Sequence, residues 1–286
     1  MLSAHPKVGM ARVKETEFFN TNYEKGSGWY EAHFPEEERS AVGEISNNYY
    51  LDPEVAKRLR TYRTGMKLIV GVRNPYGLLE SFHAFGQRRG LDLPPLGQAL
   101  DYPIGPIMGS GYDERLRLGV LTTSDSVTLL ESVMLGARLE PFFRAFPSSQ
   151  IYVFVYERLA QDPLALLSEV YDFIGVDPGF VPDRVRDVVN PTVAPRAKVV
   201  AQAASRAAFA LRSIGAYRML NALRDSPLVR GLLYRTPSRN AGKSASEVRD
   251  ALPIAASRRI DHDTLEVLPS LHPALRFVSQ HYAPKA

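Results

Sequence analysis

The stretch KLIVGVRNP, residues 67–75, decides the fold class of this chain. Leu68–Val72 is an unbroken apolar run, which is typical of a strand in a parallel sheet covered on both faces. Asn74 is a favourable N-cap and Pro75 a favourable first helical residue, so a helix is expected directly after the strand. A buried strand that leads straight into a helix indicates an α/β protein.

A second stretch further along the chain repeats this arrangement. Ile151–Tyr156 (IYVFVY) predicts another buried strand, and Asp162–Ile174 predicts a helix that begins at an Asp-Pro pair. Gly175 follows where a C-cap glycine belongs. Asp52–Tyr62 likewise begins with Asp-Pro and predicts a helix before the first strand. Strands and helices therefore alternate, as parallel sheets require.

Three other regions are less regular. Gly86–Tyr112 is rich in Gly and Pro and predicts a long loop. Thr128–Phe146 predicts a helix that Pro141 kinks or restarts. His262–Tyr282 predicts a last helix with a break near Pro269.

Composition excludes several classes of protein. The chain has 286 residues, of which 45% are hydrophobic, so a sizeable core is expected and wholesale disorder is not. Cysteine is absent, which excludes disulfides, cysteine-ligated metals and thiol nucleophiles. No apolar run is long enough to span a bilayer, and the first residues show no signal-peptide pattern. A cytoplasmic location is therefore expected.

The net charge of +4 is unevenly distributed. Arg196–Lys243 holds ten Lys or Arg residues and a single acid, Asp225. Such a segment suits an anionic membrane, an anionic cofactor or nucleic acid, or forms a solvated helical surface. Its arginines do not fall on one helical stripe, which argues against a simple membrane-surface helix.

Two places carry candidate chemistry. Arg73 stands where the first strand ends and the next helix begins, a corner that suits an anion such as phosphate, and Ser81 lies two helical turns further on. The alternative is an arginine that is ion-paired at a strand end. Lys14 and Glu15 precede the aromatic pair Phe18-Phe19, so Glu15 is a candidate general base, or else a solvated charge. No metal-ligand spacing, nucleophile elbow or dinucleotide loop is present, and AGKS at 241–244 lacks the rest of a phosphate-binding loop.

In combination, these segments resemble the sulfotransferases that use 3′-phosphoadenosine 5′-phosphosulfate (PAPS), in the branch that contains heparan-sulfate sulfotransferases and many bacterial members. The resemblance runs in order through His5-Pro6, Lys14–Phe19, Tyr23–Tyr30, Gly43–Tyr50, Leu68–Pro75 with Ser81, and Tyr156–Gly175. It implies an α/β fold like that of P-loop NTPases, a parallel sheet flanked by helices, with a helical C-terminal region. Residues 1–190 are expected to form this core, and 191–286 a helical, basic extension of the same domain.

The resemblance also implies roles for individual residues. Arg73 and Ser81 match the pair that binds the 3′-phosphate of PAPS. Glu15 matches the general base, with Lys14 beside it. The implied reaction is sulfuryl transfer from PAPS as co-substrate to a hydroxyl or amine of a carbohydrate or small metabolite, with no metal and no nucleic acid partner.

The sequence departs from the family pattern in two ways. The family's first strand and its K-x-G-T-T loop, which binds the 5′-phosphosulfate, have no counterpart here. The lysine of the family's E-K-[ST] stretch is Ile45. Two alternatives to an active enzyme therefore stay open: a non-catalytic homologue that binds the nucleotide, and an interaction protein that docks on an anionic membrane or partner through its basic helices. The oligomeric state is left open.

Overall fold

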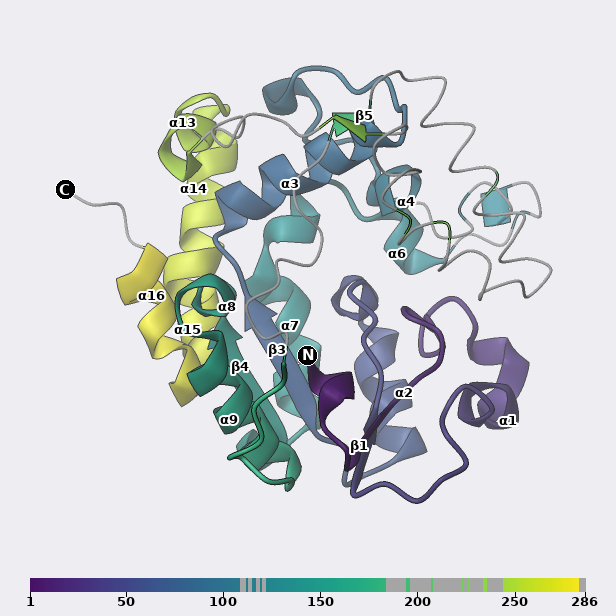
Figure 1. Cartoon of the computed structure of the whole chain (residues 1–286). Coiled ribbons are helices and arrows are strands. Elements are labelled where there is room, and N and C mark those ends of the chain that lie inside the picture. Colours follow the sequence, from purple (N-terminus) through teal and green to yellow (C-terminus); the bar gives the residue numbers. More distant parts are fainter. Residues whose placement is uncertain are drawn as a thin grey trace. The chain divides into compact units, whose positions relative to one another are not determined.

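The computed structural model describes residues 1–108, 112, 115–116, 119, 122–183, 194–195, 207, 223, 226, 234–235 and 244–282 (Figure 1). The chain divides into two compact units. Unit 1 comprises residues 1–75, 134–187 and 258–286, and unit 2 comprises 76–133 and 188–257. The sequence-based division at residue 190 stays a prediction, and most of the basic segment 196–243 lies outside the described residues.

The strands of unit 1 are parallel, as predicted. β1 (Val8–Met10) pairs with β2 (Ala41–Gly43), and β3 (Leu68–Val72) pairs with β4 (Ile151–Val155). In the described part of the chain these are two separate two-stranded sheets. Helices flank them, which confirms the α/β class: α2 (Glu54–Tyr62), α7 (Leu135–Ala145), α8 (Arg158–Gln161) and α9 (Pro163–Ile174), with the shorter α1 (Gly26–Glu31) before β2.

Helix α9 is built as its sequence predicts. The Asp162 side chain accepts a hydrogen bond from the Ala165 amide at 3.1 Å, which caps the first turn. Gly175 ends the helix in the left-handed conformation with φ 85°. Between these caps, α9 buries Leu167 and Tyr171 against Val8 of β1. Tyr152 of β4 packs on the Phe173 ring of the same helix, so α9 contacts both strand pairs.

One edge of β3 has no strand beside it among the described residues. The Val72 carbonyl accepts from the Tyr156 amide, so the backbone groups of Val72 and of alternate residues before it point toward β4. Those of Ile69 and Gly71 therefore point to the opposite edge. On the face of the strand, the Ile69 side chain is 39% exposed. Val42 of β2 is also exposed, at 52%. The absence of the family's first strand stays a prediction.

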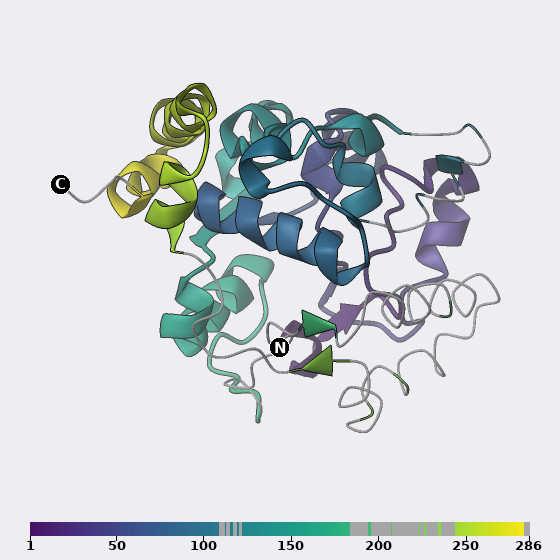
Figure 2. The same cartoon turned by 90° about the horizontal axis from the view of Figure 1, so that it is seen from above.

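Unit 2 is assembled from short elements around buried aliphatic side chains. It contains most of α3 (Pro75–Arg88), then α4 (Ile104–Met108), α6 (Thr123–Ser126), α13 (Ala245–Asp250) and the antiparallel pair β5 (Ala194–Pro195) and β6 (Tyr234–Arg235), seen side by side in Figure 2. The predicted loop at 86–112 is wrong in part, because α3 runs to Arg88 and α4 forms within it. Ile104 and Ile107 are fully buried, and this packing outweighs the helix-breaking Gly105-Pro106 between them.

Two predicted helices also differ from the structure. The expected helix 128–146 is a 3₁₀ turn (Glu131–Val133) followed by α7, which passes through Pro141 without ending. Buried Leu139 and Phe142 flank the proline, so packing outweighs the lost backbone hydrogen bond. The C-terminal helix is α14 (Ile254–His262), a π-helical turn (Asp263–Val267), α15 (Leu268–Leu271) and α16 (Arg276–Tyr282). The predicted break near Pro269 is wrong, because this proline lies in the first turn of α15, where its missing N–H costs no bond, and the helix ends at the extended His272 instead.

Asp263 in the π-helical turn forms hydrogen bonds with the first turn of α7. Asp263 is 2% exposed, and its carboxylate accepts from the amides of Gly136 at 2.7 Å and Ala137 at 2.9 Å. A Cβ at Gly136 would stand 2.8 Å from Asp263 Oδ1, so only glycine allows this approach. Asp263 therefore caps a helix that is distant in sequence.

Across the residues that the structure describes, no helix is long and apolar enough to cross a membrane.

Replacement of Asp263 by Ala should lower the free energy of unfolding by about 2 kcal/mol, because two buried amides lose their acceptor.

Burial raises the pKa of the Asp263 carboxyl, so the folded state binds its proton more tightly than the unfolded state. The contribution of this group is therefore greatest at acid pH and falls as the pH rises through the raised pKa. Urea unfolding should show a larger deficit near about pH 4 than at neutrality. Asp172→Ala, on the exposed face of α9, is the matched control; an equal loss in both variants would refute the capping role.

Candidate active site

The turn that carries Glu15 is anchored by aromatic side chains. Phe18 and Phe19 are 2% and 0% exposed. Both pack on the ring of Tyr30, with centroid distances of 4.6 and 5.1 Å. Phe19 also contacts Tyr62. This cluster fixes the chain directly after Glu15, whose own side chain is half-buried, whereas Lys14 is exposed.

The segment after β2 holds the other side of the turn. The Glu15 amide donates to the Ile45 carbonyl at 3.0 Å, and the Glu17 amide donates to Ser46 Oγ at 3.2 Å. Asn47 Nδ2 donates to Glu15 Oε1 at 3.1 Å. The Glu15 carboxylate is therefore oriented by a defined partner. The Ile45 side chain, at the position where the resemblance implies a lysine, is 47% exposed.

Arg73 lies at the carboxyl end of β3, as predicted. Its guanidinium carbon is 5.2 Å from the centroid of the Tyr156 ring. Arg73 has no hydrogen bond or ion pair with any residue that the structure describes. This is contrary to the alternative of an arginine neutralised at a strand end, and it leaves the N–H donors of the guanidinium available to an anion.

A carboxylate also lies at this corner. Glu157 Oε1 accepts from the Asn74 amide at 3.3 Å, and Glu157 Oε2 accepts from the Tyr282 hydroxyl at 2.6 Å. The same hydroxyl lies 3.0 Å from the Val72 carbonyl oxygen. Burial, followed by the hydrogen bond to Glu157, raises the pKa of Tyr282 above its ordinary value, so the hydroxyl stays a donor. One amide at the start of α3 is therefore already bonded to Glu157.

The four predicted site residues do not all fall in one unit. Lys14, Glu15 and Arg73 belong to unit 1, whereas Ser81 lies on α3 in unit 2. A joint action of Arg73 and Ser81 on one phosphate therefore stays a prediction. Sequence reasoning gave no role to Glu157 or Tyr282. The signal for Glu157 is its place directly after the predicted strand 151–156, and no local pattern predicts Tyr282.

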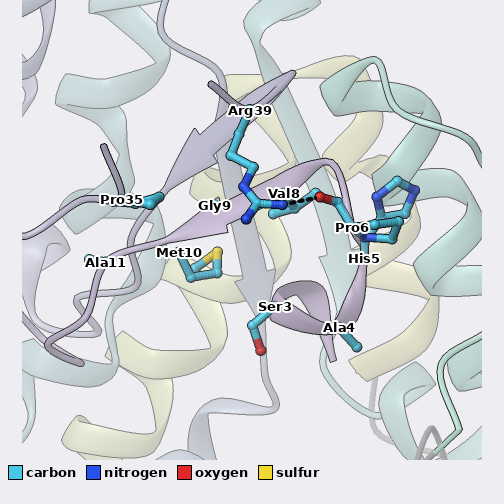
Figure 3. Close-up of a pocket in the computed structure, with 10 residues that line it drawn as sticks. All are labelled: Ser3, Ala4, His5, Pro6, Val8, Gly9, Met10, Ala11, Pro35 and Arg39. Atoms are coloured by element: carbon cyan, nitrogen blue, oxygen red, sulfur yellow. Dashed lines mark hydrogen bonds between the residues drawn. The ribbon is translucent and has the colours of Figure 1, made fainter. Parts of the chain in front are cut away.

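A cavity of about 370 Å³ lies elsewhere in unit 1, along β1 (Figure 3). Residues Ser3–Pro6, Val8–Ala11, Pro35 and Arg39 line it. The Arg39 side chain reaches across β1 and donates to the Pro6 carbonyl, and it also pairs with Glu37. None of the four predicted site residues lines this cavity. The described residues include no group of three His, Asp or Glu side chains that could hold a metal ion.

Comparison with known proteins identifies the class. No protein-family model matches the chain. It is 29% identical over 179 residues to mouse heparan sulfate glucosamine 3-O-sulfotransferase 3B1. This match covers 61% of this chain and 41% of the relative. It is 30% identical over 180 residues to human heparan sulfate glucosamine 3-O-sulfotransferase 6. This match covers 61% of this chain and 47% of the relative. The chain thus spans less than half the length of these curated relatives.

A solved structure shares the fold. The crystal structure of a sulfotransferase from Alicyclobacillus acidocaldarius matches with a TM-score of 0.51 and 21% identity, over 80% of this chain and 91% of that chain. By sequence, this chain is related to sulfotransferases over 61% of its length, and its α/β fold is shared with a sulfotransferase of solved structure.

Replacement of Tyr282 by Phe should lower the free energy of unfolding by about 1 kcal/mol, because the bond to Glu157 and the contact with the Val72 carbonyl are lost. Urea unfolding measures this. Tyr156→Phe, which keeps the ring beside Arg73, is the matched control and should stay near the wild-type value. Equal stability of Tyr282→Phe and wild type would contradict a structural role for that hydroxyl.

Proposed function

We propose that this protein transfers the sulfuryl group of PAPS to a hydroxyl or amine of an acceptor. The observation that carries the proposal is the sequence relationship to curated sulfotransferases. Two features of the structure support it. The Glu15 carboxylate accepts a hydrogen bond from Asn47, and Arg73 is a half-buried residue without an ionic partner among the described residues.

In the proposed reaction, Glu15 acts as the general base. It takes the proton of the acceptor hydroxyl or amine as that atom attacks sulfur. The new bond to sulfur forms as the bond from sulfur to the 5′-phosphate oxygen breaks, and adenosine 3′,5′-bisphosphate leaves. Lys14 stabilises the charge on the transferring group, and Arg73 with Ser81 binds the 3′-phosphate. No step requires a metal ion.

A carbohydrate acceptor is the first candidate, because the names of two relatives specify glucosamine in heparan sulfate. A small metabolite is the alternative. A cytoplasmic location, a bacterial source and a peripheral membrane contact through the basic segment stay predictions.

A second candidate function is supported by Ile45. An exposed isoleucine in the place of the family's lysine supplies no charge to a sulfate oxygen. The chain would then bind adenosine 3′,5′-bisphosphate without rapid transfer. Binding and turnover therefore need separate measurements.

Replacement of Arg73 by Ala should weaken binding of adenosine 3′,5′-bisphosphate by about tenfold or more, because a charge-assisted phosphate contact is lost. Isothermal titration calorimetry measures the dissociation constant. Arg144→Ala removes an exposed arginine that pairs with Glu140 on α7 and is the matched control. Undiminished affinity of Arg73→Ala would exclude Arg73 from the nucleotide site.

Replacement of Glu15 by Gln should lower kcat for transfer from radiolabelled PAPS by about 10²- to 10⁴-fold, because the amide cannot accept the proton. Affinity for adenosine 3′,5′-bisphosphate should stay at the wild-type level. Glu37→Gln, at an exposed glutamate, is the charge-matched control. Full activity of Glu15→Gln would show that another group is the base, and a wild-type chain that binds but never transfers would favour the second candidate function.

A further inference from the structure

Glu44, directly after β2, is the centre of a hydrogen-bond network that the predicted site did not include. Its Oε2 accepts from Thr16 Oγ1 at 2.5 Å and from Ser46 Oγ at 2.8 Å. Its Oε1 accepts from the Tyr49 hydroxyl at 2.5 Å. Three hydroxyls therefore converge on one carboxylate.

These hydroxyls remain donors at physiological pH. Burial, followed by the charge of Glu44, raises the pKa of both Tyr30 and Tyr49 above the ordinary value. Thr16 is 2% exposed, so its hydroxyl has little access to water. A buried donor that loses its acceptor is destabilising. The Glu44 carboxylate therefore determines how Thr16 and Tyr49 are oriented.

The network continues into the backbone of the Glu15 turn. The Phe18 amide donates to Thr16 Oγ1 at 3.4 Å, and the Phe19 amide donates to the Tyr49 hydroxyl at 3.4 Å. Each of these hydroxyls donates in turn to Glu44. Chains of hydrogen bonds polarise and strengthen one another in a protected environment. Glu44 thus supports two consecutive backbone amides through two side chains.

The turn itself is in a conformation that needs such support. Glu15 has φ 59° and Glu17 has φ 48°, both in the left-handed region that residues other than glycine rarely adopt. Thr16, between them, bonds to Glu44. Strained backbone of this kind persists only where the surrounding contacts over-determine it. Ile45, Ser46 and Asn47, which directly follow Glu44, also bond to Glu15 and Glu17 of this turn.

We propose that Glu44 is a positioning residue, which fixes the Glu15–Glu17 turn through Thr16 and so aims the Glu15 carboxylate at the acceptor. This inference rests on the proposed function for its catalytic consequence. Its structural part, the control of the turn by Glu44, is independent of that function. The role differs from that of the neighbouring Ile45, whose exposed side chain takes no part in the network.

Transfer kinetics test the catalytic consequence. Glu44→Gln should lower kcat by about 10- to 100-fold, as expected for a displaced catalytic group, with KM for PAPS unchanged within about twofold. Thr16→Val, which removes the linking hydroxyl, should reproduce this loss, whereas Thr16→Ser, which keeps it, should retain activity. Glu37→Gln is the charge-matched control and should resemble the wild type.

A double-mutant cycle separates positioning from general destabilisation. If Glu44 acts through Glu15, Glu44→Gln should cause no further loss of kcat in the Glu15→Gln background. Losses that multiply fully would overturn the proposal, as would a wild-type kcat in Glu44→Gln.

Hydrogen exchange tests the structural part without any activity. The amides of Glu15 and Glu17 should exchange faster in Glu44→Gln and in Thr16→Val than in the wild type, and Thr16→Ser and Glu37→Gln should not show this. Unchanged exchange in the first two variants would refute the positioning role. If the wild type transfers no sulfuryl group, the proposed function fails, and exchange still decides whether Glu44 controls the turn.

Discussion

The register between β3 and β4 determines which residues meet beyond the carboxyl ends of these strands, where Arg73, Tyr156 and Glu157 lie. Because Val72 is opposite Val155, Arg73 follows beside Tyr156 and Asn74 beside Glu157. A slip of one residue would turn the buried face of β4 toward solvent and separate these pairs. The apolar side chains of two strands thus determine where a cation, an aromatic ring and a carboxylate meet, although none of those three groups contributes to the core.

The pairing of β1 with β2 likewise determines where Glu15 lies. Met10 is opposite Gly43, and the pairing continues past the strands through the bonds from Ala11 to Gly43 and from Glu15 to Ile45. Two segments that leave a parallel pair on the same side therefore stay together. Glu44 and Thr16 meet because of this continuation. In both pairs, polar chemistry is concentrated just beyond the carboxyl ends of parallel strands, as the geometry of such sheets favours.

The sequence was sufficient where local signals and burial agree. The apolar runs gave β3 and β4, and the caps of α9 followed from Asp162 and Gly175. It was insufficient where distant packing decides. Pro141 stays inside α7 because its neighbours are buried, and α4 forms at Gly105 because two isoleucines enter the core. Contacts such as Tyr282 with Glu157 join residues 125 positions apart, and no periodicity encodes them. The resemblance to sulfotransferases supplied Glu15 but not the network that orients it.

In the described part of the chain, Arg73 lies near a carboxylate without pairing with it. An ion pair between Arg73 and Glu157 would have engaged the guanidinium and weakened any phosphate site. The Glu157 carboxylate instead accepts hydrogen bonds from the Asn74 amide and the Tyr282 hydroxyl, two neutral donors. Arg73 is held by the face of Tyr156, a contact that orients a guanidinium without occupying its N–H groups. Tyr282 thus gives Glu157 a partner other than Arg73, although Tyr282 and Arg73 are more than two hundred positions apart in the sequence.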